Sequence, residues 1–405
     1  MQRYDTYKDS GVKWLGEIPS HWEMKHLRNF LTLFSEKGYG NSQLLSVTRE
    51  RGVILRDKES KEENHNFVPD DLSGYKHLEA GDFVINKMKS WQGSYGVSDY
   101  EGIVSPAYFT CKLHGVNPQF FSRAIRSKAY VGFFMQYSKG IRVDQWDLDP
   151  SSMKDIPFIL PPIAEQTAIA NYLDTATAKI DSAIAQQQKM IDLLNERKQI
   201  IINNAVTKGL NPNAKMKDSG VEWIGEIPEG WEVRRLKSMM SIQRGHDLTA
   251  ESFKEGEIPV YGSSGLMGYH NRKTSKAPSI VIGRSGSVGK LHYIEEDFWA
   301  HNTAIYLTDN KGNCVKYLYY LLSSIELSSL ATQTAVPTLD RKNVLDYCVP
   351  VSLDVCEQLG IARYLDKNLA TIDVAISDKN KQISLLQERK QIIINDVVTG
   401  KVKVI

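Results

Sequence analysis

The stretch ERKQIIIN at residues 196–203 returns unchanged at residues 388–395, which is 192 positions later. A shorter match has the same offset, because YLD at residues 172–174 returns at residues 364–366. Identity over eight consecutive residues is more than helix propensity alone produces. We therefore interpret the chain as a tandem duplication, and this repeat organises the rest of the sequence.

Each copy of this stretch closes a long segment with the apolar spacing of an amphipathic helix. The two segments run from about Ile163 to Thr207 and from about Leu359 to Thr399. Their apolar residues form the narrow seam of a two-helix coiled coil, and about 44 residues give a rod of roughly 65 Å. We expect the two rods to pack antiparallel on each other, the alternative being that each lies on its own domain. The seam residues are Ile180, Ile184, Ile191, Leu194, Ile201 and Ala205, then Ile372, Ile376, Ile383, Leu386, Ile393 and Val397.

The composition is that of an ordinary folded protein. The 405 residues leave room for two or three domains, and 41% are hydrophobic and 24% charged. No apolar run approaches the roughly 20 residues of a membrane span, and the polar N-terminus lacks a signal peptide's apolar segment. The four cysteines form no CxxC pair, so we expect a reducing cytoplasm and no zinc site. With a net charge of +2, any nucleic-acid surface must be a local patch.

A second repeat opens each half of the chain. KDSGVKWLGEIP at residues 8–19 returns as KDSGVEWIGEIP at residues 217–228, and Trp22 has its counterpart in Trp231. Because glycine and proline punctuate this opening motif, we predict a loop pinned by its two tryptophans rather than a helix or a strand. Each half is then an opening motif, a body and a long helix.

The two bodies do not resemble each other in sequence. Strand-like runs lie at 82–86 and 103–109 in the first and at 279–283 and 303–307 in the second, and helical patches follow at 118–136 and 315–331. Such mixtures predict α+β domains. The predicted fold class is therefore α+β, a pseudo-twofold tandem repeat with two long helices packed as an antiparallel coiled coil. The predicted boundaries are 1–155 and 209–355 for the α+β domains and 156–208 and 356–405 for the helices.

Two glycine-rich, cationic stretches are candidates for binding phosphate. GRSGSVGK at residues 283–290 fails as a P-loop, because Arg284 and Leu291 stand where glycine and a hydroxyl residue are required. It suits a DNA backbone instead, although a tight turn with exposed charge fits equally well. In the first body, NKMKSWQGS at residues 86–94 interleaves cations with amide, hydroxyl and aromatic groups, which suits contacts with phosphates and base edges.

No stretch carries a catalytic or metal-binding motif. The nine histidines lack HxxxH and HExxH spacing, and there is no GxSxG elbow. The Asn-Pro-Pro-aromatic run of adenine methyltransferases is absent as well. We therefore expect no catalytic residue and no metal ligand, and any catalysis must reside on other chains.

The repeated frames carry a resemblance to a known family. Two divergent bodies, each introduced by SGVxWxGEIPxxW and closed by a helix with EQ, YLD, ID and ERKQIII, resemble the specificity subunit of a type I restriction-modification system. The resemblance covers nearly the whole chain. YGSSG at 261–265, GRSGSVG at 283–289 and WAHNT at 299–303 resemble a recurrent pattern of target recognition domains, and GDFVINKMKSWQG at 81–93 resembles another.

The resemblance implies a non-catalytic, cytoplasmic, DNA-binding subunit without a membrane partner. Each body would be a target recognition domain that reads one half of a bipartite, asymmetric site in double-stranded DNA. The helices would set the spacer and dock two methyltransferase subunits, with restriction subunits joining them. This chain would bind no cofactor, and S-adenosylmethionine, ATP and Mg would belong to the partners. The alternative is a coiled-coil scaffold protein without direct DNA recognition.

Candidate contact residues follow from residue type and from position in the family pattern. Those expected at DNA are Lys87, Lys89, Trp91, Gln92, Ser94, Arg142, Gln145, Arg244, Ser263, Ser264, Arg272, Lys273, Arg284, Ser285, Ser287, Lys290, His301, Asn302 and Thr303. Those expected at the partner subunits are Glu165, Gln166, Glu196, Arg197, Glu357, Gln358, Glu388 and Arg389.

Overall fold

The computed structural model describes residues 2–13, 15–57, 68–140, 146–249, 255–333 and 337–404. The chain divides into two compact units. Unit 1 consists of Met1–Gln187 and Lys381–Ile405, and unit 2 consists of Gln188–Asn380. Each unit contains one half of each long helix, α4 (Ile163–Lys208) and α7 (Val355–Val398).

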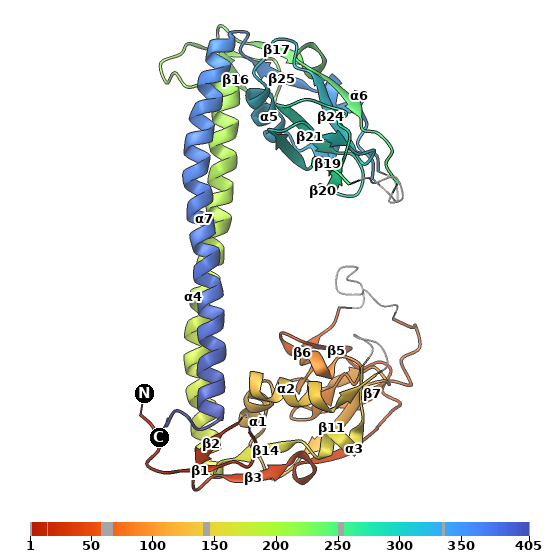
Figure 1. Cartoon of the computed structure of the whole chain (residues 1–405), viewed down its shortest axis with the longest axis vertical. Helices are drawn as coiled ribbons and strands as arrows, with labels where there is room; N and C mark the ends of the chain where they lie inside the picture. The colour runs from red at the N-terminus through yellow and green to blue at the C-terminus, as the bar shows by residue number, and fades with distance from the viewer. Residues whose placement is uncertain are drawn as a thin grey trace. The chain divides into compact units, whose positions relative to one another are not determined.

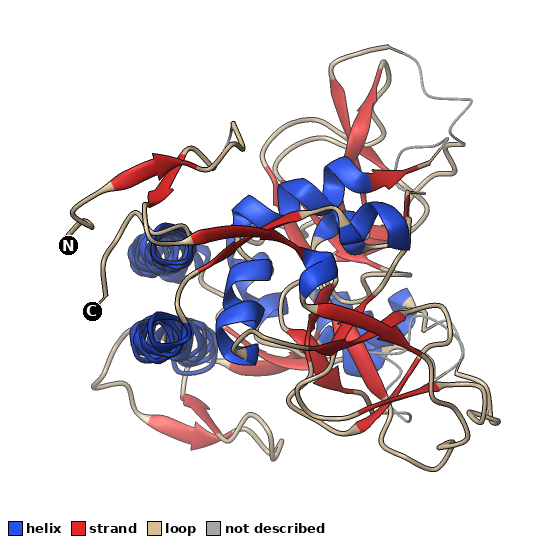
Figure 2. Cartoon of the chain, turned by 90° about the horizontal axis from the view of Figure 1, so that it is seen from below, coloured by secondary structure: helices blue, strands red, loops and turns tan. Residues whose placement is uncertain are grey.

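In unit 1, the first half of α4 lies antiparallel beside the last half of α7 (Figures 1 and 2). Ile169 near the start of α4 shares a buried core with Val397 near the end of α7. Farther along α4, Asp181 Oδ1 accepts from Lys390 Nζ, which lies earlier in α7, at 2.6 Å. Residue numbers thus rise along one helix as they fall along the other.

Unit 2 contains the same arrangement with the helix halves exchanged. Val206 of α4 shares a core with Ile361 of α7, and Lys198 Nζ lies 2.5 Å from Asp373 Oδ1. The helices are 46 and 44 residues long, and all twelve predicted seam residues are buried or half-buried. The predicted antiparallel coiled coil is confirmed.

The opening motif forms a two-stranded hairpin in each unit, so the predicted loop is wrong. β1 (Tyr7–Asp9) pairs antiparallel with β2 (Glu17–Pro19), and β15 (Met216–Asp218) pairs with β16 (Glu226–Pro228). The connecting turns each contain two glycines with φ between 67° and 75°. Glycine supplies these left-handed turn positions. The three-residue strands on either side of each turn are too short to show a period in sequence.

One tryptophan of each motif anchors the hairpin. Trp22 and Trp231 are buried, and their indole Nε1 atoms donate to Glu165 Oε2 at 2.8 Å and to Glu357 Oε2 at 3.0 Å. The other tryptophan of the second motif, Trp223, is 45% exposed, so it does not pin the motif as predicted. Its counterpart, Trp14, lies outside the described residues.

The two bodies share a sheet topology that their sequences conceal. Each contains a four-stranded antiparallel sheet, with strand order β4-β11-β8-β9 in unit 1 and β18-β24-β21-β22 in unit 2. In both, the first strand of the sheet pairs with the last, and the middle two form a hairpin. The likeness escapes sequence comparison because a sheet core requires apolar side chains of suitable volume, not particular identities. The strands are β4 (Leu31–Phe34), β8 (Phe83–Ile85), β9 (Tyr95–Val97) and β11 (Phe109–Leu113), then β18 (Ser241–Arg244), β21 (Ser279–Gly283), β22 (Leu291–Ile294) and β24 (Ala304–Asp309).

Helices and short strand pairs complete each body and join it to the long helices. In unit 1, β3 pairs with β14 beside the start of α4, and in unit 2, β17 pairs with β25 beside the start of α7. Unit 1 adds the pairs β5-β6, β7-β10 and β12-β13, and unit 2 adds the sheet β20-β19-β23. The bounds in unit 1 are β3 (Glu23–His26), η1 (Leu27–Asn29), β5 (Leu45–Thr48), β6 (Gly52–Leu55), β7 (Lys76–Leu78), η2 (Ser90–Gln92), β10 (Gly102–Val104), α1 (Pro118–Ile125), α2 (Lys128–Tyr137), β12 (Ser138–Lys139), β13 (Asp147–Leu148), α3 (Pro150–Lys154) and β14 (Pro157–Leu160). Those in unit 2 are β17 (Glu232–Arg235), η3 (Leu236–Ser238), β19 (Ile258–Gly262), β20 (Gly265–His270), β23 (Trp299–Ala300), α5 (Val315–Ser323), η5 (Leu327–Leu330), α6 (Arg341–Asp346) and β25 (Cys348–Val351).

The predicted elements exist but are more finely divided than the sequence indicates. The helical patch at 118–136 is two helices, because Ser127 adopts an extended conformation between them. The patch at 315–331 is α5 followed by a 3₁₀ turn, and the run at 103–109 ends one strand and begins another. Pro106 interrupts that run, since proline has no backbone N–H to donate to a neighbouring strand. The predicted α+β fold class is confirmed.

Glu357→Ala tests the anchor in unit 2. The substitution leaves the buried Trp231 indole N–H without its acceptor, which costs about 1–3 kcal/mol. We expect the free energy of unfolding, measured by urea denaturation with tryptophan fluorescence, to fall by that amount. Glu388→Ala, on the exposed face of α7, is the control and should change it by no more than about 0.5 kcal/mol. Equal effects of the two substitutions would contradict the anchor.

Candidate nucleic-acid interface

The two glycine-rich stretches singled out in the sequence occupy the same turn of equivalent sheets. Residues 86–94 connect β8 to β9, and residues 284–290 connect β21 to β22. Each hairpin contains the two strands that are last in its sheet order. Two dissimilar loops therefore present different side chains from one topological position.

In unit 2, three loops far apart in sequence meet around Thr303. Thr303 accepts hydrogen bonds from the other two loops. Its side-chain Oγ1 accepts from the backbone N–H of Ser263 at 3.2 Å, and its backbone carbonyl oxygen accepts from the N–H of Arg284 at 2.8 Å. Lys290 Nζ reaches the carbonyl oxygen of Ser264 at 3.2 Å. We call this set of loops the glycine-loop cluster. Its members are Ser263, Ser264, Arg284, Ser285, Ser287, Lys290, His301, Asn302 and Thr303.

Glycines make this close approach of the loops possible. A Cβ atom on Gly283 would lie 2.0 Å from the Ser287 carbonyl oxygen, and one on Gly245 would lie 2.1 Å from the carbonyl oxygen of His301. Contacts this short with backbone atoms force the backbone to move. The glycines of GRSGSVGK thus allow close packing as well as the turn itself. A tightly packed turn is compatible with both interpretations of this stretch, the DNA-backbone contact and the turn with exposed charge.

The cluster offers donors and cations at the surface. Ser264 and Lys290 are exposed, and most other members are half-buried. Ser263 is the exception at 9% exposure, so its side chain contributes to packing rather than to the surface. The backbone groups of Arg284 and Ser285 are partly used within the fold, because Ser285 forms a bridge with Thr338.

Two predicted cationic sites of unit 2 have acidic partners. Arg244 Nη2 lies 3.3 Å from Asp247 Oδ1, and the side-chain amide of Asn302 donates to the same carboxylate, which joins Arg244 to the cluster. Lys273 Nζ lies 2.5 Å from Asp297 Oδ2, and Arg272 is exposed beside it. A cation that is already paired makes a weaker electrostatic contribution to phosphate binding than an unpaired one.

The sequence interpretation missed His292. Its Nε2 atom lies 3.4 Å from the Ser263 carbonyl oxygen, within the cluster. Burial lowers the pKa of His292, and the nearby Lys290 ammonium lowers it further. A neutral imidazole results, which both donates and accepts hydrogen bonds. The only sequence signal was its place two residues after Lys290.

In unit 1, the loop at 86–94 contains two lysines and one member of an aromatic pair. Lys89 is exposed, whereas Lys87 Nζ bonds to Asp147 Oδ2 at 2.9 Å. The half-buried Trp91 lies against Trp146, with ring centroids 5.3 Å apart. Trp146 and Asp147 are residues that the sequence did not single out.

The remaining predicted residues of unit 1 differ in outcome. Gln92 is half-buried, but Ser94 is only 3% exposed, so its hydroxyl is not available at the surface. The buried strand β9 begins at the next residue, so Ser94 lies beside buried residues. Arg142 and Gln145 lie outside the described residues.

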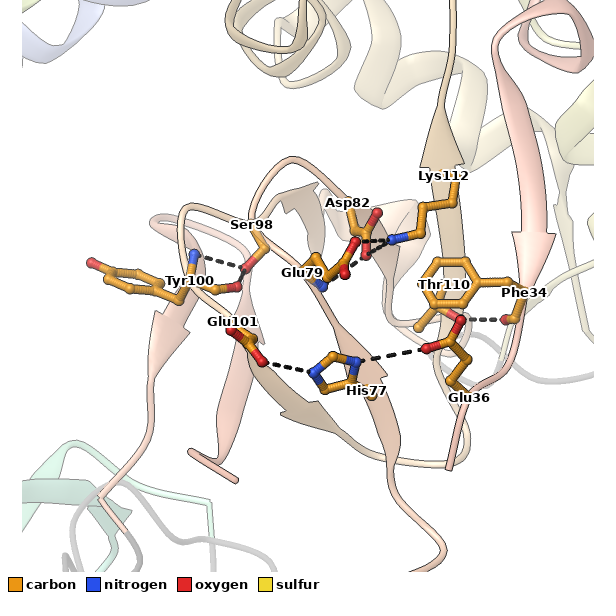
Figure 3. A network of polar contacts seen from close by, with 10 residues as sticks. All are labelled: Phe34, Glu36, His77, Glu79, Asp82, Ser98, Tyr100, Glu101, Thr110 and Lys112. Atoms are coloured by element: carbon orange, nitrogen blue, oxygen red, sulfur yellow. Dashed lines mark hydrogen bonds and ion pairs between the residues drawn. The ribbon is translucent and has the colours of Figure 1, made fainter. Parts of the chain in front are cut away.

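A separate polar network braces the sheet of unit 1 (Figure 3). Lys112 Nζ bonds to Glu79 at 2.6 Å and to Asp82 at 3.1 Å, and the Lys112 ammonium lowers the pKa of Glu79. His77 points its two ring nitrogens toward Glu36 at 3.8 Å and Glu101 at 3.2 Å. These contacts tie neighbouring strands together. In the part of the chain that the structure describes, no three His, Cys, Asp or Glu residues are grouped to hold a metal ion.

The EQ pair that begins each long helix serves the fold of its own chain. Gln166 and Gln358 are buried, and they accept from the backbone N–H groups of Asn117 at 2.8 Å and Cys314 at 2.9 Å. Those two residues are the N-caps of α1 and α5. Burial keeps both glutamines from a partner subunit, and the structure assigns them the internal task of fixing a body on a helix.

The other half of each EQ pair anchors the opening motif. Glu165 and Glu357 accept from the buried tryptophans, so these carboxylates are also used within the chain. The four remaining residues predicted at a partner subunit, Glu196, Arg197, Glu388 and Arg389, are exposed on the long helices. No helix within the described ranges is both long enough and apolar enough to cross a membrane.

Comparison with known proteins finds relatives that match most of the chain. Residues 228–385 match the family model of the type I restriction modification DNA specificity domain. The MjaX protein of Methanocaldococcus jannaschii, described as a type I restriction enzyme specificity subunit, is 26% identical, with 98% of each chain covered. Over nearly its whole length, this chain is thus similar to a type I specificity subunit. Its glycine-loop cluster lies inside the matched residues.

A second relative and a solved structure extend the similarity. The MjaVIII specificity subunit of the same organism is 27% identical, and the alignment covers 67% of this chain and 68% of that protein. A solved structure that concerns complex assembly and conformational transition of the type I R-M system contains a chain with a TM-score of 0.69 and 13% identity. The alignment covers 95% of this chain and 99% of that one. At 13% identity, this similarity shows a shared fold.

Gly283→Ala tests whether the close approach of the loops is required. The added methyl group meets the Ser287 carbonyl oxygen, so the backbone of the loop must move. We expect loss of specific DNA binding in a gel-shift assay and a destabilisation of about 1–3 kcal/mol. Gly230→Ala, where an added Cβ meets nothing within 4 Å, is the control and should retain binding. Unchanged binding by the Gly283 variant would contradict the role of the cluster.

Proposed function

We propose that this chain selects the DNA target of a type I restriction-modification complex. Each body reads one half of a bipartite, asymmetric site, and α4 and α7 set the unread spacer. The observation that carries the proposal is the glycine-loop cluster. It lies inside the matched residues 228–385, and its loop at 284–290 occupies the same topological turn as the cationic loop at 86–94.

The side chains at these turns suit duplex DNA. The exposed cations Lys89 and Lys290 can each neutralise a phosphate, while Gln92, Asn302 and His292 carry groups that pair with base edges. The major groove distinguishes all four base pairs, so dissimilar side chains on a common frame read different sequences. With a net charge of only +2, such affinity must come from these local patches.

The chemistry of the complex resides on partner subunits in this proposal. Methyltransferase subunits carry S-adenosylmethionine and methylate adenine, and restriction subunits carry ATP and Mg. This chain positions those subunits on the chosen site in the cytoplasm and catalyses nothing itself. A coiled-coil scaffold without DNA recognition is the less favoured interpretation, because it gives no function to the two glycine-rich loops at equivalent turns.

Matching apolar patches on the long helices supply docking sites for two copies of one partner. Leu193 and Ile200 of unit 2 are 49% and 51% exposed, and Leu385 and Ile392 of unit 1 are 56% and 51% exposed. Seven residues make nearly two helical turns, so each pair lies on one face of its helix. Glu196 and Arg197 lie between the first pair, and Glu388 and Arg389 lie between the second. Each patch therefore presents apolar contact beside the same two charges.

Changing one patch should remove one copy of the partner. We expect the double variant Leu193→Glu, Ile200→Glu to bind a single methyltransferase subunit, because a buried unpaired carboxylate opposes docking. Native mass spectrometry of the co-expressed complex gives the stoichiometry. Asn195→Glu is the control, since residue 195 is exposed and lies about 200° around the helix from residue 193. Retention of two subunits by the double variant would contradict this docking surface.

A map of methylated bases tests the reading role. DNA from cells that express this chain with its methyltransferase subunit should contain methyladenine in both halves of one split motif. Replacement of residues 27–155 by the body of another family member should change one half and leave the other half unaltered. A change in both halves would contradict independent reading by the two bodies. Absence of methylation despite an assembled complex would favour the scaffold.

A further inference from the structure

The β19–β20 hairpin of unit 2 displays apolar side chains beside the glycine-loop cluster. Leu266, Met267 and Tyr269 are 50%, 48% and 54% exposed, and all three belong to β20. β20 is the edge strand of the sheet β20-β19-β23 (Figure 1). Three large apolar side chains in solvent on one short strand indicate a contact surface.

A β-bulge produces this exposure. Tyr261 of β19 pairs with Leu266, and Val260 pairs with Gly268, so Met267 has no partner residue. A regular strand sends successive side chains to opposite faces, whereas a bulge interrupts that alternation and changes the direction of a side chain. Leu266 and Met267 consequently both reach solvent.

The hairpin is fixed against the cluster at its tip. A Cβ atom on Gly262 would lie 2.3 Å from Met267 Sδ and 2.9 Å from Thr303 Oγ1. Met267 therefore lies over this glycine, next to the threonine on which the cluster is built. At the tip itself, the Ser264 carbonyl oxygen accepts from Lys290 Nζ. The apolar strand and the polar cluster form one continuous surface.

Cations flank β20 at both ends. The exposed Lys290 lies at the tip of the hairpin, and the exposed Arg272 follows two residues after the strand ends. Glu255 and Glu257, which precede β19, are exposed acids at that far end. An apolar strand with the exposed Lys290 at its tip suits the major groove, where base edges lie beside the phosphate backbones.

We propose that β20 enters the major groove and that Leu266, Met267 and Tyr269 contact the 5-methyl groups of thymine. This inference rests on the proposed DNA-reading function. The major groove accommodates a two-stranded β-ribbon, and the thymine methyl is the apolar group that base pairs expose there. The half-site read by unit 2 thus contains A·T pairs that are recognised through their methyl groups.

The test uses the motif that the wild-type complex methylates, which establishes the reading function independently. The half-site of unit 2 is the one that stays constant when residues 27–155 are exchanged. Duplexes in which each thymine of that half is replaced singly by deoxyuridine lack one methyl group and no hydrogen-bonding group. At one or more positions, we expect the wild-type complex to bind about fourfold more weakly, the loss that corresponds to one buried methyl group.

A variant protein separates this contact from a general defect. Leu266→Ala with Met267→Ala should bind thymine and deoxyuridine duplexes alike and should accept more bases at that position of the methylation map. Tyr100→Ala, an exposed aromatic in unit 1, is the control and should retain the discrimination. The inference is overturned if deoxyuridine is tolerated at every position or if the half-site contains no A·T pair. It is also overturned if the variant keeps the discrimination but loses a subunit, which would make β20 a protein contact.

Discussion

A buried indole N–H that donates to a helix-starting glutamate holds each unit together. Trp22 to Glu165 and Trp231 to Glu357 connect the opening hairpin to the first turn of a long helix. The next residue, Gln166 or Gln358, fixes the N-cap of the first helix after the sheet of the body. Two adjacent side chains thus set the position of hairpin and body on one helix. An unsatisfied indole or amide at this depth would be costly, so the polar contacts specify the arrangement more sharply than apolar packing alone.

This arrangement separates what is constant from what varies. The repeated residues form the helices and the opening hairpins, and the sheets keep one strand order while their sequences diverge. The turns of the two sheets differ as well: β8–β9 presents lysines beside a tryptophan pair, and β21–β22 presents a glycine-rich arch. The scaffold tolerates such exchange because a turn makes few core contacts.

The sequence predicted elements correctly where a periodic pattern extends over many residues. It predicted the position of a side chain wrongly where a single tertiary contact determines that position. The coiled-coil seam is visible because twelve apolar positions follow one spacing. Ser94 was expected at the surface, yet the start of β9 buries it. The EQ pair was expected at a partner, yet its conspicuous repetition reflects an internal anchor. Repetition in sequence shows that a residue has a role in both halves, but it does not show whether that residue contacts a partner subunit or its own chain.

The sequence by itself determined the tandem duplication, the antiparallel helix pair, the α+β bodies and the glycine-rich loops. These features depend on local spacing and on exact repeats, which a linear reading contains. Only the tertiary structure decided that the loops at 263–264, 284–290 and 301–303 meet around Thr303 and that a bulge exposes β20 beside them. Residues separated by up to 40 positions come together there through strand order and register. Those depend on the packing of the whole sheet, and no local pattern encodes them.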